Sequence, residues 1–464
     1  MIYNTMKELK DGCAGILRID GGNVIISNDD KLRSDLIDDL AYTAALSPDE
    51  ATQRAARWLI RRAGATMGIL SASIQPLYEA MGRKEVTGLT VPAINLRGIA
   101  YHCAQAVFRA ALAGNVGPIL FEIARSEIGY TAQRPDEYTA IVTAAAIKTG
   151  YHGPLFMQGD HFQVNAKKYA ADPKGEVDAV RALIREAVAG GFYNIDIDAS
   201  TVVDLSKPTL QEQQEGNYAI TAELTALIRA LEPEGITISV GGEIGEVGTK
   251  NTTVEEFEVF MKNYRSVLAA KGESLKGISK ISIQTGTSHG GVPLPDGSIA
   301  DVKIDFDTLR DISEAARSGF GLSGAVQHGA STLPNEAFDK FPKAETAEVH
   351  LATGFQNIIY DSAHFPSELR DRIYRYLNSD LRGEKKDADT EEQFIYKTRK
   401  KGFGTFKKDL WQMPPDVLAS LGEELERQFA FLFDKLNVRN TGEIVERYVT
   451  PVDVPMEVPA GLTE

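Results

Sequence analysis

The sequence predicts an α/β protein whose central part is a (β/α)8 TIM barrel, with a helical extension at each end. Between about residues 88 and 365, eight short apolar runs alternate with longer stretches that carry apolar residues at helical spacing. Each run is rich in Ile, Val or Phe and is bounded by Gly, Pro or polar residues, which is typical of a buried parallel strand. No glycine-rich dinucleotide turn follows the first run, which disfavours a doubly wound open sheet.

Taken in order, the eight runs give the expected barrel strands, and the stretches between them give the expected helices. The predicted strands are Leu89–Leu96, Gly117–Ala124, Pro154–His161, Asn194–Ser200, Gly235–Ile244, Ile278–His289, Ser323–Ser331 and Gly354–Asp361. Helices are expected between them, for example over Val177–Ala189 and Thr221–Leu231.

The barrel is expected to span residues 88–365, which leaves extensions at 1–87 and 366–464. In the N-terminal extension, helices are predicted around Pro48–Gly64 and Ala72–Met81. In the C-terminal extension, helices are predicted around Ser367–Leu377 and Pro415–Leu436, and a Pro- and Val-rich tail is expected to be poorly ordered or to lie along the surface.

Composition favours a soluble, cytoplasmic protein. The net charge of −15 argues against nonspecific binding to nucleic acid, which needs clustered Lys and Arg. Cys13 and Cys103 are the two cysteines of the chain, too few for a disulfide framework or a cysteine zinc site. No apolar run approaches the roughly 20 residues needed to cross a bilayer, so no membrane partner is expected.

Polar residues cluster where the predicted strands end, the usual place of the active site in such barrels. Of seven histidines, three close predicted strands: His161, His289 and His328. Together with Glu243 on the fifth strand, they predict an open site for a divalent cation. The other four histidines are interpreted as structural or surface residues: His102, His152, His350 and His364.

Small and hydroxyl residues surround this predicted metal site and indicate phosphate binding. Gly290, Gly329 and Ala330 leave backbone N–H groups bare, and side-chain donors are added by Ser288, Ser331 and Asn357. The alternative is that these residues only serve tight turns. A basic stretch, Lys397–Lys408, is a second candidate for phosphate contact, or else a solvated charged face.

The order of these motifs resembles class II, zinc-dependent fructose- and tagatose-bisphosphate aldolases over about residues 88–365. The similarity rests on Val91–Asn95, Asp160-His161, Phe192–Ser200, Gly242–Gly245, Gly286–Gly290, Gln327–Ser331 and Asn357. It implies a lyase that interconverts a ketose 1,6-bisphosphate with dihydroxyacetone phosphate and an aldehyde phosphate. It also implies Zn²⁺ or another divalent cation as cofactor, a monovalent cation as a further ion, and a homo-oligomer.

The resemblance assigns a role to each matching residue. The metal ligands would be His161, His289 and His328, with Asp198 and Glu243 near the metal or its alternative position. Asp160 would exchange the proton of the substrate C4 hydroxyl. Substrate and phosphate would be held by Asn95, Ser126, Gly290, Gly329, Ser331 and Asn357.

The sequence departs from the family at the loop after the fifth strand, where Gly248–Asn251 holds no carboxylate. Glu246 is the candidate substitute as the second catalytic residue. A Schiff-base mechanism is disfavoured because no lysine is found at the end of a predicted strand, and Lys280 lies near the start of the sixth one. The remaining alternative is a non-catalytic accessory subunit that resembles the large partner of tagatose-bisphosphate aldolase; an intact set of three histidines argues against it.

Overall fold

The centre of the molecule is a closed barrel of parallel strands, as the alternating runs predict. The computed structural model describes residues 1–245, 250–286 and 304–462. Within these residues, eight parallel strands pair in chain order, and pairing of the last with the first closes the ring. The strands are β4 (Val91–Asn95), β5 (Leu120–Ala124), β6 (Pro154–Gln163), β7 (Asn194–Asp198), β8 (Ser239–Gly245), β9 (Lys280–Ile283), β10 (Ala325–Gln327) and β11 (Glu348–Leu351).

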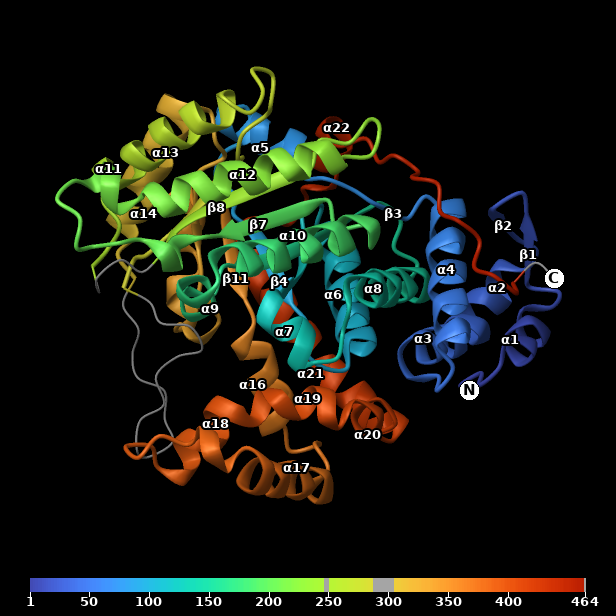
Figure 1. Cartoon of the computed structure of the whole chain (residues 1–464). Coiled ribbons are helices and arrows are strands. Elements are labelled where there is room, and N and C mark those ends of the chain that lie inside the picture. The colour runs from blue at the N-terminus through green and yellow to red at the C-terminus, as the bar shows by residue number, and fades with distance from the viewer. Residues whose placement is uncertain (246–249, 287–303, 463–464) are drawn as a thin grey trace.

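Helices surround this barrel and cover the outward apolar face of the strands (Figure 1). They are α6 (Ala100–Gly114), α8 (Pro135–Thr149), α10 (Pro173–Ala189), α12 (Glu215–Leu231), α13 (Val254–Ala269) and α14 (Phe306–Ala315), with shorter α7 (Arg125–Tyr130), α9 (Ala166–Ala171), α11 (Leu210–Gln213) and α15 (Lys340–Lys343). Local signals fix where they begin. Thr253 and Glu256 form a capping box before α13, and the Asp172 side chain accepts from the Gly175 N–H at the start of α10.

The eighth strand does not lie where the sequence predicts it. The predicted run Gly354–Asp361 falls inside helix α16 (Thr353–Asp361), and the strand that closes the barrel is the earlier β11. The apolar pair Ile358-Ile359 marks the helix face and not a strand, whereas β11 carries Glu348 and His350 among its four residues. A buried strand with two ionisable residues does not look apolar in a sequence.

The N-terminal extension packs on one side of the barrel through its helices. Its elements are α1 (Met6–Cys13), the hairpin β1 (Leu17–Asp20) and β2 (Asn23–Ile26), α2 (Asp29–Lys31), α3 (Ile37–Leu46), α4 (Glu50–Thr66), β3 (Leu70–Ser71) and α5 (Gln75–Gly82). Gly21 and Gly22 both have positive φ, 56° and 87°, which a two-residue hairpin turn requires. Helices α3 and α4 contact α8, and β3 adds a short parallel pairing to β6.

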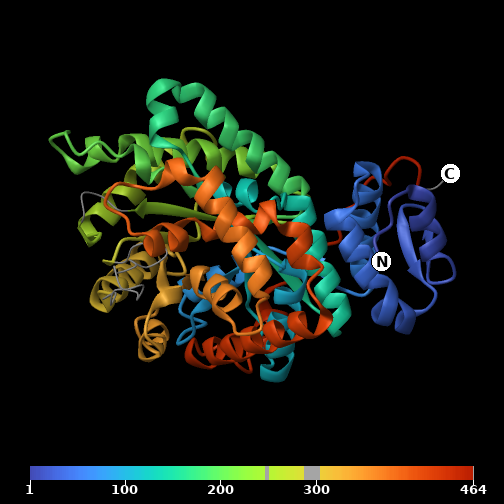
Figure 2. The same ribbon diagram turned by 90° about the horizontal axis from the view of Figure 1, so that it is seen from below.

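The C-terminal extension divides into a helical cover and an extended tail. Helices α17 (Ser367–Asp380), α18 (Glu391–Thr398), α19 (Gly402–Thr405) and α20 (Lys407–Trp411) lie together at one end of the barrel (Figures 1 and 2). Helix α21 (Pro415–Lys435) packs along α6, and α22 (Gly442–Tyr448) contacts α5.

Residues 451–462 then run back across the N-terminal extension, as the sequence analysis expects of an arm that lies along the surface (Figure 1). The Arg62 guanidinium donates to the Asp453 carboxylate over 2.6 Å, and Leu462 is buried.

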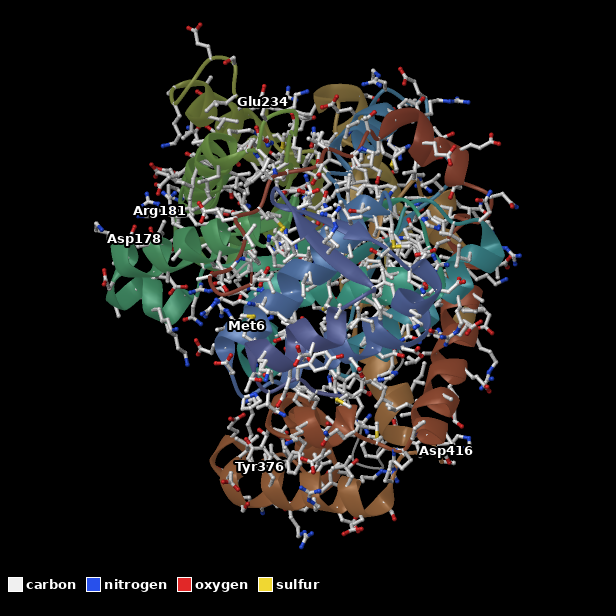
Figure 3. All side chains as sticks on the ribbon, turned by 90° about the vertical axis from the view of Figure 1, so that its right-hand side faces the viewer. Met6, Asp178, Arg181, Glu234, Tyr376 and Asp416 are labelled. Carbon is white, nitrogen blue, oxygen red and sulfur yellow. The ribbon has the colours of Figure 1, made fainter. Side chains whose placement is uncertain are left out.

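The outward faces of the helices are polar. On α10, Arg181 donates to Asp178 over 2.5 Å, and both residues lie at the edge of the molecule (Figure 3). Within the described residues, no helix combines the length and the apolar character that a bilayer crossing needs.

Candidate metal centre and active site

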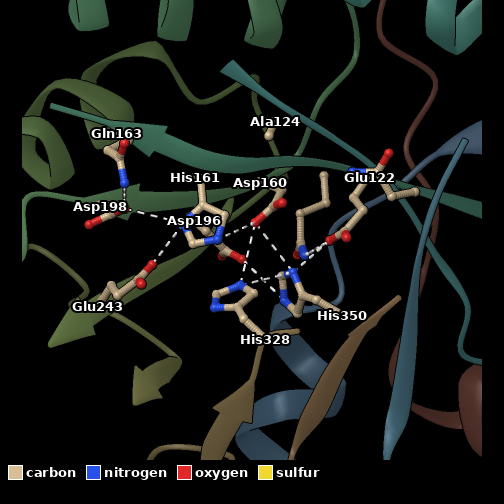
Figure 4. Close-up of polar contacts among 12 residues, drawn as sticks. Glu122, Ala124, Asp160, His161, Gln163, Asp196, Asp198, Glu243, His328 and His350 are labelled. Carbon is tan, nitrogen blue, oxygen red and sulfur yellow. Dashed lines mark hydrogen bonds and ion pairs between the residues drawn. The ribbon is translucent and has the colours of Figure 1, made fainter. Parts of the chain in front are cut away.

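Five side chains that the sequence predicts as catalytic or metal-binding come together at the carboxyl ends of four strands (Figure 4). They are Asp160 and His161 on β6, Asp198 on β7, Glu243 on β8 and His328 directly after β10. All five are buried or nearly so. The barrel topology explains their meeting, because the ends of parallel strands surround one axial point.

A bulge in β6 aims two neighbouring residues at the same point. The pairing of β6 with β7 shifts register between Gly159 and Phe162, and His161 has a positive φ of 40°. Side chains normally alternate between the two faces of a strand, so a regular strand would turn either Asp160 or His161 away from the barrel axis. A positive φ is costly for a residue other than glycine and is typical of functional positions.

The upper part of this centre joins one imidazole to two carboxylates. His161 Nδ1 lies 3.0 Å from Glu243 Oε2 and 3.2 Å from Asp198 Oδ2. Ser200 and Gln163 also donate to Asp198, over 2.7 and 2.5 Å, and hold its carboxylate in place. One nitrogen facing two carboxylate oxygens is a donor set that a divalent cation can share.

Asp160 connects this group to the neighbouring histidines. Its Oδ1 atom lies 3.8 Å from His161 Nε2, 3.5 Å from His328 Nε2 and 3.3 Å from His350 Nδ1. Despite these neighbours, Oδ1 is buried without a hydrogen bond to any part of the chain that the structure describes. A buried carboxylate oxygen left in this way points to a missing cation or proton.

Burial and mutual charge shift the pKa values of these groups strongly. Burial, with the nearby charge of Asp198, raises the pKa of Glu243 to about 7. Burial also opposes ionisation of Asp160, but the His161 and His350 imidazoles outweigh it and hold the pKa of Asp160 well below its usual range. For His161, the charges of Asp160 and Glu243 outweigh burial and raise the imidazole pKa. Asp160 is therefore a carboxylate at neutral pH and can accept a proton.

Beneath the strand ends, the barrel interior is filled by ionic side chains instead of the usual branched apolar ones. Lys280 Nζ lies 2.6 Å from Glu348 and 3.0 Å from Asp196, and it donates to Gln158 over 2.8 Å. Because these residues come from β6, β7, β9 and β11, their contacts cross the centre of the barrel. From the sequence, Lys280 is expected only near the start of its strand, and it is the first residue of β9.

His350 belongs to this interior, so of its two expected places, structural or surface, its burial excludes the surface. It lies on β11, is 5% exposed, and its Nδ1 atom lies 2.8 Å from Glu122 Oε2 and 3.1 Å from His328 Nε2. Since the predicted eighth strand started six residues too late, His350 falls outside every predicted strand. The sequence does contain a signal for this strand. Glu348 and His350 are two residues apart, the spacing at which side chains share one face of a strand.

A cavity of about 730 Å³ opens above these groups. Among the predicted substrate-binding residues, it is lined by Asn95, Ser126, Gly329 and Ser331. A volume of this size suits a small organic ligand. Gly329 has a positive φ of 70°, which places a left-handed residue directly after His328.

Asn357 is the predicted substrate-binding residue that the fold does not bring to this cavity. It lies on α16, where its side-chain oxygen accepts from Arg399 over 2.7 Å and its NH₂ donates to the Tyr396 hydroxyl over 3.1 Å. Its amide thus joins the barrel to the C-terminal helices. Three further predicted residues, Glu246, His289 and Gly290, lie outside the described residues.

One residue of the basic stretch lines the cavity. Lys400, from the segment between α18 and α19, has no carboxylate within ion-pair distance in the described chain and lies over the Tyr130 ring. Burial, together with the nearby positive charge of Arg97, lowers its pKa. Lys407, in contrast, is engaged by Glu137 and by the Ala132 carbonyl. Lys400 is therefore a cation of the same chain that an anionic ligand in the cavity could contact.

A comparison with protein families matches the chain to one of them. The model described as fructose-bisphosphate aldolase class-II matches residues 77–402, which is well over half of the sequence. No curated protein matches at a significant level.

Several solved structures match the chain at low identity. A probable tagatose 6 phosphate kinase from Sinorhizobium meliloti 1021 is 14% identical, with 77% of this chain and 93% of that chain covered and a TM-score of 0.50. Fructose-bisphosphate aldolase from Campylobacter jejuni is 17% identical, with 81% and 97% covered and a TM-score of 0.47. The YdjI aldolase from Escherichia coli K12 is 12% identical, with 80% and 100% covered and a TM-score of 0.49. At these identities the likeness concerns the fold alone.

Proposed function

This chain belongs to the class II fructose-bisphosphate aldolase family, and from that premise we propose that it is a metal-dependent lyase acting on a ketose 1,6-bisphosphate. The reaction is the reversible cleavage of a fructose- or tagatose-type substrate to dihydroxyacetone phosphate and an aldehyde phosphate. The observation that supports the proposal most is the meeting of Asp160, His161 and His328 with two further carboxylates at the mouth of the barrel.

The donor set at the strand ends fits a divalent cation. Imidazole nitrogen and carboxylate oxygen are the ligands that Zn²⁺ accepts in open catalytic sites. The buried and unpartnered Oδ1 of Asp160 supports a cation there, since the oxygen otherwise lacks a hydrogen bond in the described structure. His161, His289 and His328 would hold the ion, with Glu243 and Asp198 beside it. When bound, it would stabilise the negative charge that develops on the ketone and hydroxyl oxygens during cleavage.

Asp160 is the proposed base. Its low pKa keeps it ionised, and its position beside His161 places it within reach of a substrate held at the strand ends. It would take the proton of the C4 hydroxyl as the C3–C4 bond breaks, and return it in the condensation direction. Glu246 remains the candidate for the enediol proton.

The cavity walls supply the proposed phosphate contacts. Backbone N–H groups near Gly329 and the hydroxyl of Ser331 would hold the phosphate next to the reacting carbons. Lys400 lies on the cavity wall without a carboxylate partner in the described chain, which suits it to the phosphate at the other end of the substrate. The homo-oligomer stays a proposal without a role in the site.

The test is an aldol-cleavage assay on the purified chain after chelation, with and without added Zn²⁺, on fructose and tagatose 1,6-bisphosphate. Asp160→Asn should lower kcat by about 10² to 10⁴ with Zn²⁺ in excess. His289→Ala should lose metal and activity together. His152→Gln is the matched control, because His152 is exposed and its ring lies against the Met67 carbonyl.

Zinc-restored cleavage that Asp160→Asn lacks would support the proposal. Cleavage that survives both chelation and Asp160→Asn would refute the mechanism. A chain that binds neither metal nor substrate would favour the accessory-subunit alternative.

A further inference from the structure

His350 occupies a position that the proposed aldolase mechanism does not use. Its ring lies one layer below the strand ends, against His328 with 4.1 Å between ring centroids and 74° between ring planes (Figure 4). Three groups surround a single atom of this ring. Nδ1 lies 2.8 Å from Glu122 Oε2, 3.1 Å from His328 Nε2 and 3.3 Å from Asp160 Oδ1.

Hydrogen bonding alone does not account for this arrangement. A ring nitrogen carries at most one hydrogen, and that hydrogen can be directed at one acceptor only. The remaining contacts would then be unsatisfied within a buried site. Asp160 Oδ1 shows this directly, since it forms no hydrogen bond with the described chain although Asp160 is 95% buried. The second carboxylate oxygen of Glu122, Oε1, is also buried without a hydrogen bond in the described chain.

The spacing of these atoms is that of ligands around a metal ion. His328 Nε2, His350 Nδ1 and Asp160 Oδ1 form a triangle with sides of 3.1, 3.3 and 3.5 Å. Ligands placed tetrahedrally at about 2.1 Å from a zinc ion are roughly 3.4 Å apart. The triangle therefore has the dimensions of one face of such a site.

The other nitrogen of His350 is held in the way that metal-binding histidines usually are. Nε2 lies 2.6 Å from Glu348 Oε1, and Glu348 is itself paired with Lys280. A carboxylate at this distance keeps the proton on Nε2 and leaves the lone pair of Nδ1 directed at the triangle. The tautomer that binds a cation is thus the one that the second carboxylate favours.

The charge of the barrel interior also calls for a cation. In the described interior below the strand ends, four buried carboxylates face one lysine, Lys280. The carboxylates are Glu122, Asp160, Asp196 and Glu348. They leave a formal excess of three negative charges when the histidines are neutral. In the metal-free chain burial opposes protonation of His350, but Glu122 and Asp160 outweigh it and raise the pKa of the imidazole. A divalent cation would take the place of that proton and reduce the excess to one. Buried charges without partners are costly, so a counter-ion at this position stabilises the barrel.

From the triangle, the unpartnered oxygens and the charge excess, we propose a second divalent-cation position inside the barrel, with His350, His328 and Asp160 as ligands and Glu122 completing the set. It lies below the position formed by His161, Asp198 and Glu243. A neutral imidazole nitrogen has one lone pair, so with both ions bound His328 would bind the inner one through Nε2. Two imidazoles with two carboxylates suit Zn²⁺, Co²⁺ or Mn²⁺. Asp160 would bind through Oδ1, which leaves Oδ2 for proton transfer. This inference goes beyond the proposed function, which needs one cation at the strand ends.

The experiment counts ions, and its readouts do not depend on aldolase activity. The full chain is freed of metal by chelation and titrated with Zn²⁺ by calorimetry, and separately with Co²⁺ by its visible absorption. Elemental analysis gives the number of ions per chain. Wild type is expected to bind two ions, and His350→Gln is expected to bind one. Glu122→Gln should weaken the same ion by about 10- to 100-fold, as the loss of a supporting carboxylate does.

Glu243→Gln is the matched control, because Glu243 contacts His161 and is not part of the triangle. It should weaken the ion at the strand ends and leave the ion at His350 unchanged. Far-UV circular dichroism checks that each variant is folded. If His350→Gln does not fold, Glu122→Gln is the decisive variant.

The outcomes separate this inference from the proposed function. Suppose that wild type binds one ion, and that His350→Gln or Glu122→Gln lowers the affinity for it but Glu243→Gln does not. This result would support the inner position and rule out an ion at the strand ends. Suppose instead that wild type binds one ion, and that Glu243→Gln lowers the affinity for it while His350→Gln and Glu122→Gln do not. This result would overturn the inference and leave the aldolase proposal standing. No bound ion would overturn both.

Discussion

Replacing Lys280 with methionine tests whether the ionic interior holds the barrel together. Lys280 is 1% exposed, and its ammonium group lies 2.6 Å from Glu348 and 3.0 Å from Asp196. Methionine keeps much of the side-chain length but removes the charge. Two buried carboxylates then lose their shared cation, and loss of one partner from a buried ion pair costs about 3–5 kcal/mol. We expect Lys280→Met to lower the free energy of unfolding by that amount.

The assay is urea unfolding at pH 7 on the chelated protein, followed by circular dichroism. The double variant Lys280→Met/Glu348→Gln should recover part of the loss, because the neutral amide leaves less charge without a partner. Lys84→Met is the matched control. Lys84 pairs with Glu314 over 2.8 Å at the surface, where such a pair is worth less than about 1 kcal/mol.

The same lysine gives a second, chemical readout. Although burial lowers its pKa, the charges of Asp196 and Glu348 outweigh that effect and raise it, so Lys280 is protonated at neutral pH. A protonated amine cannot attack a ketone. Borohydride reduction in the presence of substrate should therefore trap no adduct on Lys280. A loss of stability no larger than that of Lys84→Met, or a trapped adduct, would refute the account of Lys280 as a structural counter-ion.

Two further predictions concern the substrate cavity and the pH dependence of stability. Lys400→Met should raise the KM for a bisphosphate roughly ten- to a hundredfold with kcat largely kept, since a hydrogen bond to a charged group contributes about 1.5–3 kcal/mol. Lys408→Met, at an exposed position, should change neither constant. Equal KM values for Lys400→Met and wild type in steady-state assays would exclude the Lys400 contact. Burial, aided by the positive charge of Arg109, lowers the pKa of His102 to about 4, whereas in the unfolded chain it is roughly 6.5. The unfolded state therefore binds the proton more readily, and the free energy of unfolding falls as the pH drops below about 6.5. Between pH 7 and pH 5 this residue should account for a loss of about 2 kcal/mol in urea unfolding, and His102→Gln should show a shallower pH dependence; parallel curves for both proteins would contradict the assignment.

The parts of the fold that the sequence predicts correctly are those with strong local patterns. The strands from β4 to β10 are bounded by glycine or polar residues, and the side chains of Asp160, His161 and Glu243 lie near the ends of two of them. The eighth strand is misplaced because its interior face carries Glu348 and His350, which makes a fully buried strand look polar. The error and the missed His350 have one cause, since an ionic barrel interior violates the rule that buried parallel strands are apolar.

Contacts between segments that are distant in the sequence could not be predicted, for a different reason. Nothing local in the basic stretch distinguishes Lys400, which lines the cavity, from Lys407, which pairs with Glu137. That distinction depends on how the C-terminal helices lie across the barrel. The match of Asn357 to a phosphate ligand failed in the same way, because its amide is used by Arg399 from that extension.

The pairing of Arg62 with Asp453 joins residues 391 positions apart. On a ribosome, Arg62 therefore emerges long before its partner exists, and the groove that Val452, Val454 and Met456 fill stays open for most of translation. The N-terminal extension is made first but receives its last packing contacts only when residues 452–462 have been added. A nascent chain stalled before that point should expose this groove, and a chaperone that recognises apolar segments would find it there.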